Sequence, residues 1–301
     1  MDPVPQPRRL LPALTILGAS ALLAWVPGCS VLVDSNRPQC SQDSDCEARG
    51  AEFAGAVCEA GLCKDDPAWR CEESTANATP PYKLTMHLQD AVSSVALPGV
   101  VAQLCRKLDV TCELPIAQAV SDAGGGVAMS IEAAFDGYVQ LTDPKIAPAL
   151  YFLNPPEQGD LDLPTVPLAS PAAATLIVRS AGGPGTTWLP DHGIVLLNAF
   201  NCQNQPAANI TYSVGGASDP ATFIFYLVNA LPTTATTTTD ETGYGGLVNM
   251  PVGSSTITAT LSPGARKVST ISVLVRAGYI SYSSVKPNAT PSGDSCRCAP
   301  M

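Results

Sequence analysis

The feature that most constrains the fold is a series of short stretches in which apolar and polar residues alternate. The stretch YKLTMHLQD, residues 82–90, is a clear example, and this period of two is typical of a half-buried β-strand. Six such stretches precede residue 155, and seven more lie between residues 193 and 286, with Gly, Pro or Asp between them. The pattern predicts an all-β chain with two antiparallel sandwiches in series.

The composition agrees with short strands and excludes some partners. Apolar residues make up 46% of the 301 residues and charged residues 14%, so the chain can bury a substantial core. The 24 glycines and 28 prolines favour turns over long helices. The net charge is −10, with only 16 basic residues. Because binding to nucleic acid requires basic groups that neutralise phosphates, we predict no nucleic-acid partner.

A proline-rich connector separates the two series of strands. Ser170, Pro171 and the glycines at 182 and 183 are arranged as the cap, first residue and stop of a short helix. A strand through TLIVR, residues 175–179, is the rival interpretation. The run TTATTTT, residues 233–239, is compatible with a strand or with an extended loop.

The first 29 residues have the order of a secretory signal. Arg8 and Arg9 precede an apolar run from Leu10 to Val26, and small residues follow it. The rival, a membrane-spanning helix, needs about 20 apolar residues, more than this run supplies. The arginine pair also occurs in twin-arginine signals, but the residues after it favour the general secretion route.

The end of this segment, VPGCS, resembles the lipobox of bacterial lipoproteins, with Val26 and Gly28 before Cys29. The resemblance implies that Cys29 carries a diacylglyceryl group and becomes the mature N-terminus, so that acyl chains attach the protein to a membrane. Eleven cysteines then leave ten for pairing. An ordinary disulfide cysteine is the alternative. Ser30 after the cysteine indicates an outer-membrane destination, by analogy with enteric lipoproteins.

Five cysteines between residues 40 and 71 indicate a small disulfide framework, because so short a segment buries little apolar surface alone. They are Cys40, Cys46, Cys58, Cys63 and Cys71. Four are expected to pair among themselves in one of three connectivities, with Cys71 left over. Zinc ligation is disfavoured because no Cys-x-x-Cys pair or histidine accompanies them. The acidic residues here are interpreted as a solvated surface rather than a calcium loop.

The positions of the other cysteines predict one disulfide that closes a local loop, and long-range disulfides from the tail that act as a staple between the tail and earlier parts of the chain. Cys105 and Cys112 bracket RKLDVT and can close a loop. Cys296 and Cys298 are too close together to pair comfortably with each other. We therefore expect them to reach Cys71 and Cys202.

Two glycine-rich stretches look like sites when each is considered alone. They are SDAGGGVAMSIEAAFDG, residues 121–137, and TDETGYGGLVNMPVG, residues 239–253. In both, an Asp is followed three residues later by Gly, then by a strand, a second glycine turn and another strand. Asp and Gly both suit turns without a ligand, so the comparison predicts architecture rather than chemistry.

This order resembles the carboxypeptidase regulatory-like domain, a transthyretin-like sandwich. The stronger copy is TDETGYGGLVNMPVGSSTITATL, residues 239–261, and the weaker is SDAGGGVAMSIEAAFDGYVQL, residues 121–141. LPGVVAQLC, residues 97–105, and NCQNQPAANITYSV, residues 201–214, resemble earlier parts of that fold. The resemblance implies Greek-key sandwiches without catalytic residues and with no particular ligand.

The chain is accordingly expected to divide into six parts. These are a lipoprotein signal (1–29), an acidic disulfide-rich segment (30–75), a first sandwich (80–155), a connector able to hold a short helix (156–189), a second sandwich (190–289) and a cysteine-containing tail (290–301).

The sequence contains few residues in patterns that indicate catalysis or ligand binding. His87 lies within a predicted strand, where a partly buried position is expected, and His192 follows Asp191 in a predicted loop. A Ser-His-Asp site lacks its Gly-x-Ser-x-Gly turn, and neither a phosphate loop nor a dinucleotide motif occurs. We predict no catalytic residue, metal or cofactor. Among the aromatic residues, Tyr244 is the candidate for ligand binding because it lies between glycines.

The leading hypothesis is a non-enzymatic, exported lipoprotein anchored to the bacterial cell envelope, with an envelope glycan or protein as partner. A glycan-binding module is the first alternative, and an exposed coplanar aromatic pair would favour it. An accessory domain of a hydrolase system is the second, and it requires a cleft with convergent titratable groups.

Overall fold

The computed structural model describes most of the chain after the predicted signal. It covers residues 38–50, 53, 56–69, 71, 80–154, 159–215, 219–262 and 266–287. The predicted lipidation site Cys29 and the tail cysteines Cys296 and Cys298 lie outside the described residues. In the described part, no helix combines the length and the apolar character that a membrane span requires.

The cysteine-rich segment is organised by two disulfides. It contains α1 (Asp43–Glu47), β1 (Ala56–Glu59), β2 (Leu62–Asp65) and η2 (Pro67–Trp69). Cys40 bonds Cys58 and Cys46 bonds Cys63, with Cα separations of 5.8 and 5.5 Å. The predicted pairing of four of these cysteines among themselves is therefore confirmed, and one of the three connectivities is selected.

The first series of predicted strands is present in full. It comprises β3 (Tyr82–Asp90), β4 (Val101–Arg106), β5 (Ala117–Val120), β6 (Gly126–Ile131), β7 (Gly137–Thr142) and β8 (Ala149–Leu153). Along β3, buried side chains alternate with more exposed ones, as the sequence pattern predicts.

The second series is also present. It comprises β10 (His192–Ala199), β11 (Ile210–Gly215), β12 (Phe223–Val228), β14 (Tyr244–Pro251), β15 (Gly253–Leu261), β16 (Arg266–Val275) and β17 (Ile280–Val285). A further short strand, β13 (Leu231–Thr233), pairs with β12. The rest of the threonine run, from Thr234 to Thr239, is a loop.

The connector holds a strand and a helix. β9 (Leu161–Leu168) was not predicted, because prolines at 164 and 167 argue against a central strand. It lies at the edge of its sheet, parallel to β3, where proline is tolerated. The predicted helix is confirmed as α2 (Pro171–Gly182), and the TLIVR strand is wrong. Ala173 N donates to Ser170 Oγ at 3.1 Å, and Gly183 after the helix has φ +85°.

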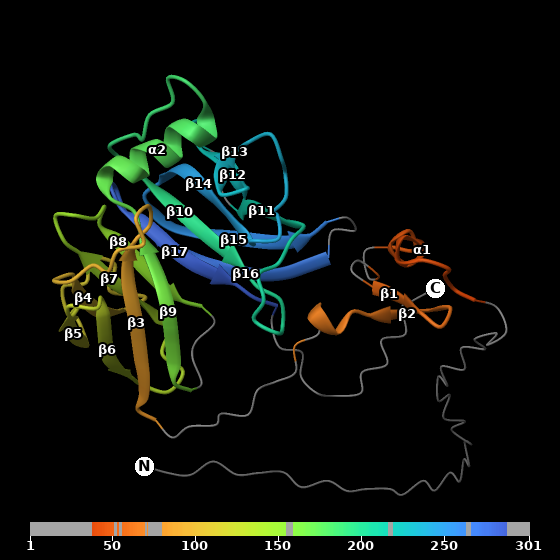
Figure 1. Ribbon diagram of the computed structural model, residues 1–301, viewed down its shortest axis with the longest axis horizontal. Coiled ribbons are helices and arrows are strands. Elements are labelled where there is room, and N and C mark those ends of the chain that lie inside the picture. The colour runs from red at the N-terminus through yellow and green to blue at the C-terminus, as the bar shows by residue number, and fades with distance from the viewer. Residues whose placement is uncertain are drawn as a thin grey trace, which may run out of the picture. The chain divides into compact units, whose positions relative to one another are not determined.

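Three sheets form the body (Figure 1). The largest has nine strands in the order β13-β12-β14-β10-β17-β8-β7-β4-β5, and it runs through both halves of the chain. The two halves join where β8 and β17 pair in parallel, with Ala149 opposite Ile280. The smaller sheets have the orders β6-β3-β9 and β11-β15-β16.

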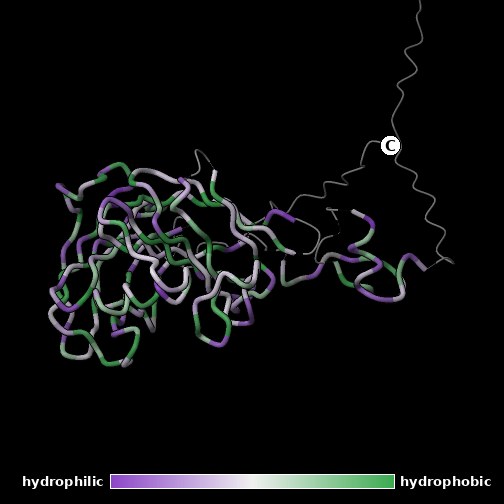
Figure 2. The backbone as a smooth tube through the Cα atoms, turned by 90° about the horizontal axis from the view of Figure 1, so that it is seen from above, coloured by the Kyte–Doolittle hydropathy of each residue, from purple (hydrophilic) through white to green (hydrophobic). Residues whose placement is uncertain are grey.

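The nine-stranded sheet is buried on both faces. The first core joins one face to β3, β6, β9 and α2, and the second joins the other face to β11, β15 and β16. Neighbouring residues of β10 show the alternation, since Ile194 belongs to the first core and Val195 to the second. In Figure 2, hydrophobic and hydrophilic stretches interleave through this body. The predicted all-β sandwich fold is therefore confirmed, and the two sandwiches share one sheet.

One further disulfide lies within the body, and another joins the body to the cysteine-rich segment. The predicted loop closure by Cys105 and Cys112 is confirmed. The expected staple from the tail is wrong, because Cys71 and Cys202 bond each other with a Cα separation of 4.9 Å. Backbone contacts explain this pairing, since Cys202 N donates to Ala68 O at 2.8 Å.

Candidate functional site

The stretch around Asp240 is a turn. Asp240 Oδ1 accepts hydrogen bonds from the backbone N and the hydroxyl of Thr242, at 2.9 and 2.5 Å, and Gly243 N donates to Asp240 O. Burial opposes ionisation, but the bonds from Thr242 outweigh it and hold the pKa of Asp240 below its usual value. Gly243 has φ +72°, and a Cβ there would lie 2.4 Å from Ala199 O. Asp240 and Gly243 therefore stabilise the conformation of the backbone in this turn.

The stretch around Asp122 has the same construction. Asp122 Oδ1 accepts from the backbone N of Gly124 and Gly126, at 2.8 and 2.7 Å, and Gly125 N donates to Asp122 O. Gly125 has φ +79°, and a Cβ there would lie 2.2 Å from Leu88 O. The prediction that the two stretches are recurring turns is confirmed.

Among the residues that the structure describes, no exposed stacked pair of aromatic side chains forms the platform that a glycan module would favour. Tyr212 and Tyr226 stack with their rings 9° from parallel, but each is only 4% exposed and belongs to the second core. Tyr244 begins β14 and is 38% exposed, and burial of its ring raises its pKa. Tyr244 as a binding residue stays a prediction.

The two histidines lie in different environments from those expected. His87 is exposed on the outward side of β3, because its neighbours Met86 and Leu88 take the core positions. His192 is the first residue of β10 rather than a loop residue, and it is 9% exposed. Its backbone O accepts from Trp188 Nε1 and from Gly278 N, both at 3.0 Å.

His192 lies between two carboxylates. Its Nδ1 is 2.8 Å from Asp191 Oδ1, and its Nε2 is 3.2 Å from Asp219 Oδ2. Because ionised carboxylates only accept hydrogen bonds, this geometry favours the imidazolium form, in which both ring nitrogens carry protons. Burial lowers the pKa of His192, but the two carboxylates raise it by more. With both nitrogens engaged, the side chain tethers β10 to the segment before β12.

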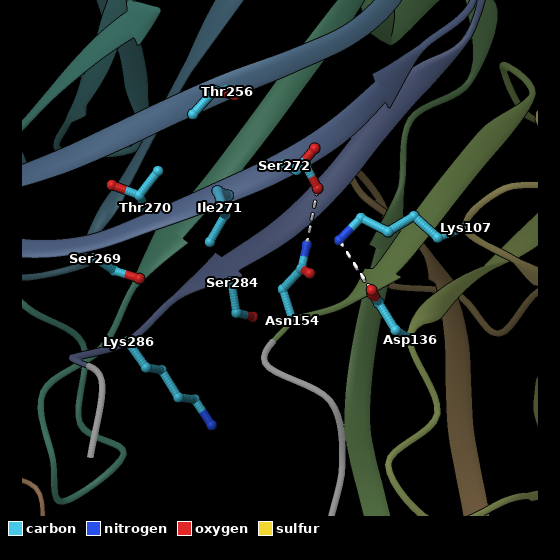
Figure 3. Close-up of a pocket in the computed structure, with 10 residues that line it drawn as sticks. All are labelled: Lys107, Asp136, Asn154, Thr256, Ser269, Thr270, Ile271, Ser272, Ser284 and Lys286. Atoms are coloured by element: carbon cyan, nitrogen blue, oxygen red, sulfur yellow. Dashed lines mark hydrogen bonds and ion pairs between the residues drawn. The ribbon is translucent and has the colours of Figure 1, made fainter. Parts of the chain in front are cut away.

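A polar groove of about 400 Å³ lies along β16 (Figure 3). Its lining combines residues from β15, β16 and β17 with residues that follow β4, β8 and β17 and precede β7. They are Lys107, Asp136, Asn154, Thr256, Ser269, Thr270, Ile271, Ser272, Ser284 and Lys286. This groove is the candidate functional site.

Some polar groups of the groove are held by hydrogen bonds or an ion pair within the protein, and others are accessible to a ligand. Lys107 Nζ pairs with Asp136 at 3.1 Å, and both face the groove in Figure 3. Asn154 Nδ2 donates to Ser272 O at 3.4 Å and to Ser283 Oγ at 3.2 Å. Lys286 Nζ lies 5.6 Å from the centre of the Phe200 ring. The groove can therefore offer hydrogen bonds and positive charge to a ligand.

Sequence reasoning missed this groove. Its hydroxyl residues occur in ordinary strand patterns, and they come together only when β16 lies beside the ends of β7 and β8. One local signal existed, because Ser269 is 3% exposed in a strand whose other buried residues are apolar.

The sulfur atoms of Cys40, Cys46 and Cys63 lie within 4.8 Å of one another, a spacing that a metal could bridge. All three are oxidised in disulfides, so they offer no thiolate to zinc.

Comparisons with known proteins do not assign a family. No family model matches the chain, and no curated protein matches it. Among solved structures, the TIE protein of Bacillus anthracis is 12% identical with a TM-score of 0.24, and the alignment covers 69% of this chain and 34% of that one. The chain thus spans about a third of that protein.

Two pilins are also similar at this level. The shaft pilin SpaA of Lactobacillus rhamnosus GG is 8% identical with a TM-score of 0.22, over 69% of this chain and 99% of that one. BcpA, the major pilin subunit of Bacillus cereus, is 10% identical with a TM-score of 0.22, over 69% and 99%. TM-scores this low do not establish a shared fold, so the fold assignment rests on the strands and sheets themselves.

Proposed function

We propose that this chain is a non-enzymatic, exported bacterial lipoprotein whose sandwiches act as a structural or binding module at the cell envelope. Acyl chains on Cys29 attach it to a membrane, for which the outer membrane is the proposed destination. Its partner is an envelope glycan or protein, and the module needs no cofactor.

The observation that carries this proposal is the set of four disulfides in the described residues. Disulfides form and persist outside the reducing cytosol, so they support export. The bond between Cys71 and Cys202 joins the cysteine-rich segment, which follows the proposed anchor, to the second half of the body. A lipid anchor at Cys29 would therefore be coupled covalently to the sandwiches at two places along the chain.

A non-enzymatic role is supported by the contacts of the acidic and histidine residues that could otherwise serve in catalysis. Asp122 and Asp240 hold turns, and His192 uses both ring nitrogens to bind carboxylates. These groups are committed to backbone and side-chain contacts that stabilise the fold.

Non-reducing peptide mapping of protein from its producing cells tests the proposal of export. The expected result is a peptide pair joined through Cys71 and Cys202, together with the three shorter bridges. Free thiols at these eight positions in freshly alkylated protein would show that the chain stays in a reducing compartment, and would refute export.

A second candidate, a glycan-binding module, is favoured by the polar groove along β16. Hydrogen-bonding groups concentrated in a concave surface suit a polyhydroxylated ligand. Tyr244, which lies outside the groove lining, remains a separate candidate contact. The variant Tyr244→Ala tests it in the same binding measurements.

A further inference from the structure

The groove along β16 contains polar groups whose hydrogen-bonding capacity is unused. The hydroxyls of Ser269 and Ser284 line it, and neither forms a hydrogen bond with any residue in the described ranges. Ser269 is only 3% exposed. The Ser269 hydroxyl itself is not fully buried, so it can bond a ligand from the groove.

One of the two lysines of the groove has no carboxylate partner in the described part of the chain. Lys107 is neutralised by Asp136 at 3.1 Å, whereas Lys286 forms no ion pair with the residues that the structure describes. Its ammonium lies over the Phe200 ring, 5.6 Å from the ring centre. Because the whole chain has a net charge of −10, one unpaired ammonium in a concave polar surface is a local feature suited to an anionic group.

The lining favours a hydroxyl-rich ligand over an extended peptide. Five of the ten lining residues carry hydroxyl groups, and Ile271 is the only apolar member. β16 is an edge strand of its sheet, but the amide of Asn154 already donates to Ser272 O. This contact interrupts the row of backbone groups that a peptide strand would need for strand addition.

A second hollow differs from the groove along β16 in the charge of its lining. A hollow of about 540 Å³ beside α2 is lined by Gly182, Thr186, Thr187, Leu189, Ala221, Phe223, Thr234 and Asn249. It presents no charged side chain. A charged ligand is therefore expected at the groove along β16.

We propose that the groove along β16 binds an acidic saccharide. A carboxylate of the sugar pairs with Lys286, and its hydroxyls bond the hydroxyls of Ser269 and Ser284 and the side-chain oxygen of Asn154. This inference rests on the proposed function as a binding module and names the ligand class. A volume of about 400 Å³ lies within the range of small-molecule sites, which suits one or two sugar units.

The test is a calorimetric titration of the full chain, purified from its producing cells, with galacturonic acid oligomers and with neutral galactose oligomers of equal length. The acidic oligomer is expected to bind, and its affinity is expected to fall as salt increases. Lys286→Gln is expected to weaken binding about tenfold, the loss of one charge-assisted hydrogen bond. Lys286→Arg keeps the charge and is expected to retain most of the affinity.

Lys83→Gln is the matched control, because Lys83 is exposed on the outward side of β3 and is absent from the groove lining. Ser269→Ala tests the contribution of this hydroxyl separately and is expected to weaken binding severalfold. Circular dichroism of each variant verifies that the sheets are retained.

Three outcomes would overturn the inference. They are no binding of the acidic oligomer at about 10 mM, equal binding of the neutral oligomer, or unchanged affinity in Lys286→Gln. Binding of an Asp-rich peptide that depends on Lys286, without binding of the saccharide, would assign the groove to peptide ligands instead. None of these outcomes bears on export or lipidation, which disulfide mapping and acyl labelling measure independently.

Discussion

The guanidinium of Arg276 donates a hydrogen bond to the phenol oxygen of Tyr138 at 2.6 Å. Arg276 lies just after β16, and Tyr138 lies on β7, so the contact joins the two halves of the chain between the small sheet β11-β15-β16 and the nine-stranded sheet. The same side chain donates to Gln140 and lies 5.4 Å from the centres of the Tyr138 and Tyr279 rings. Tyr138 in turn donates to the carbonyl of Asp109.

Removing this contact should loosen the joint between the halves. Arg276→Met is expected to lower the free energy of unfolding by about 1–3 kcal/mol, because it removes two charge-assisted hydrogen bonds and two cation–π contacts. Urea unfolding of the full chain measures the loss. Arg179→Met, at an exposed position of α2, is the control and should change stability by less than about 0.5 kcal/mol. Equal effects of the two variants would contradict a role for Arg276 in joining the halves.

The disulfides Cys71–Cys202 and Cys105–Cys112 should differ in their contribution to stability. Chain-entropy arguments give roughly 5 kcal/mol for a loop of 131 residues and roughly 2.4 kcal/mol for one of 7. The pair Cys71→Ala and Cys202→Ala is therefore expected to lower the unfolding free energy more than the pair Cys105→Ala and Cys112→Ala. Denaturant unfolding of both double variants makes the comparison. The reverse order would mean that the long loop is already restricted in the unfolded chain.

The tether at His192 should make stability depend on pH. Because its folded pKa lies above its ordinary value of 6.5, the charged imidazole contributes stability that is fully present below pH 6.5. This contribution is lost as the pH rises through the folded pKa. Asp191 and Asp219 have lowered pKa values, so they weaken the tether only as the pH falls below their ordinary value of 3.8.

NMR titration of the imidazole protons measures this directly, with His87→Gln assigning the only other histidine. Asp219→Asn is expected to lower the pKa of His192, and His192→Gln to flatten the dependence of stability on pH above 6. A His192 pKa at or below 6.5 in the wild-type protein would contradict the ion-paired geometry.

Gly243 distinguishes a turn from a binding site. Gly243→Ala is expected to cost at least about 2 kcal/mol of unfolding free energy, because φ is +72° and the new Cβ would meet Ala199 O at 2.4 Å. Gly159→Ala is the control, since a Cβ there has no atom within 4 Å. Thermal unfolding compares the two. A stable Gly243→Ala protein would reopen the question of what this glycine does.

Local patterns predicted local structure well. The alternation in YKLTMHLQD gives β3, and Ser170 with Pro171 gives the start of α2, because both signals depend on neighbours within a few residues. The recurrence of Asp and Gly around residues 122 and 240 identified turns for the same reason. β9 was not predicted, because its prolines are acceptable only at the edge of a sheet, and the local sequence does not encode that position.

Long-range relationships could not be predicted in this way. The parallel pairing of Ala149 with Ile280 joins residues far apart in the chain, and no local signal marks it. The partner of Cys71 was wrong because cysteine counting leaves several pairings open. The groove was missed because its residues come from three strands and four flanking segments.

We propose that this β-sandwich protein is exported and held to a membrane through Cys29. Incorporation of radiolabelled palmitate into the wild-type protein and the Cys29→Ala variant tests it most directly, with disulfide mapping to verify that both proteins are folded and exported. We expect label and membrane association in the wild type, and loss of both in Cys29→Ala. Equal labelling of the two proteins, or no label in either, would contradict it.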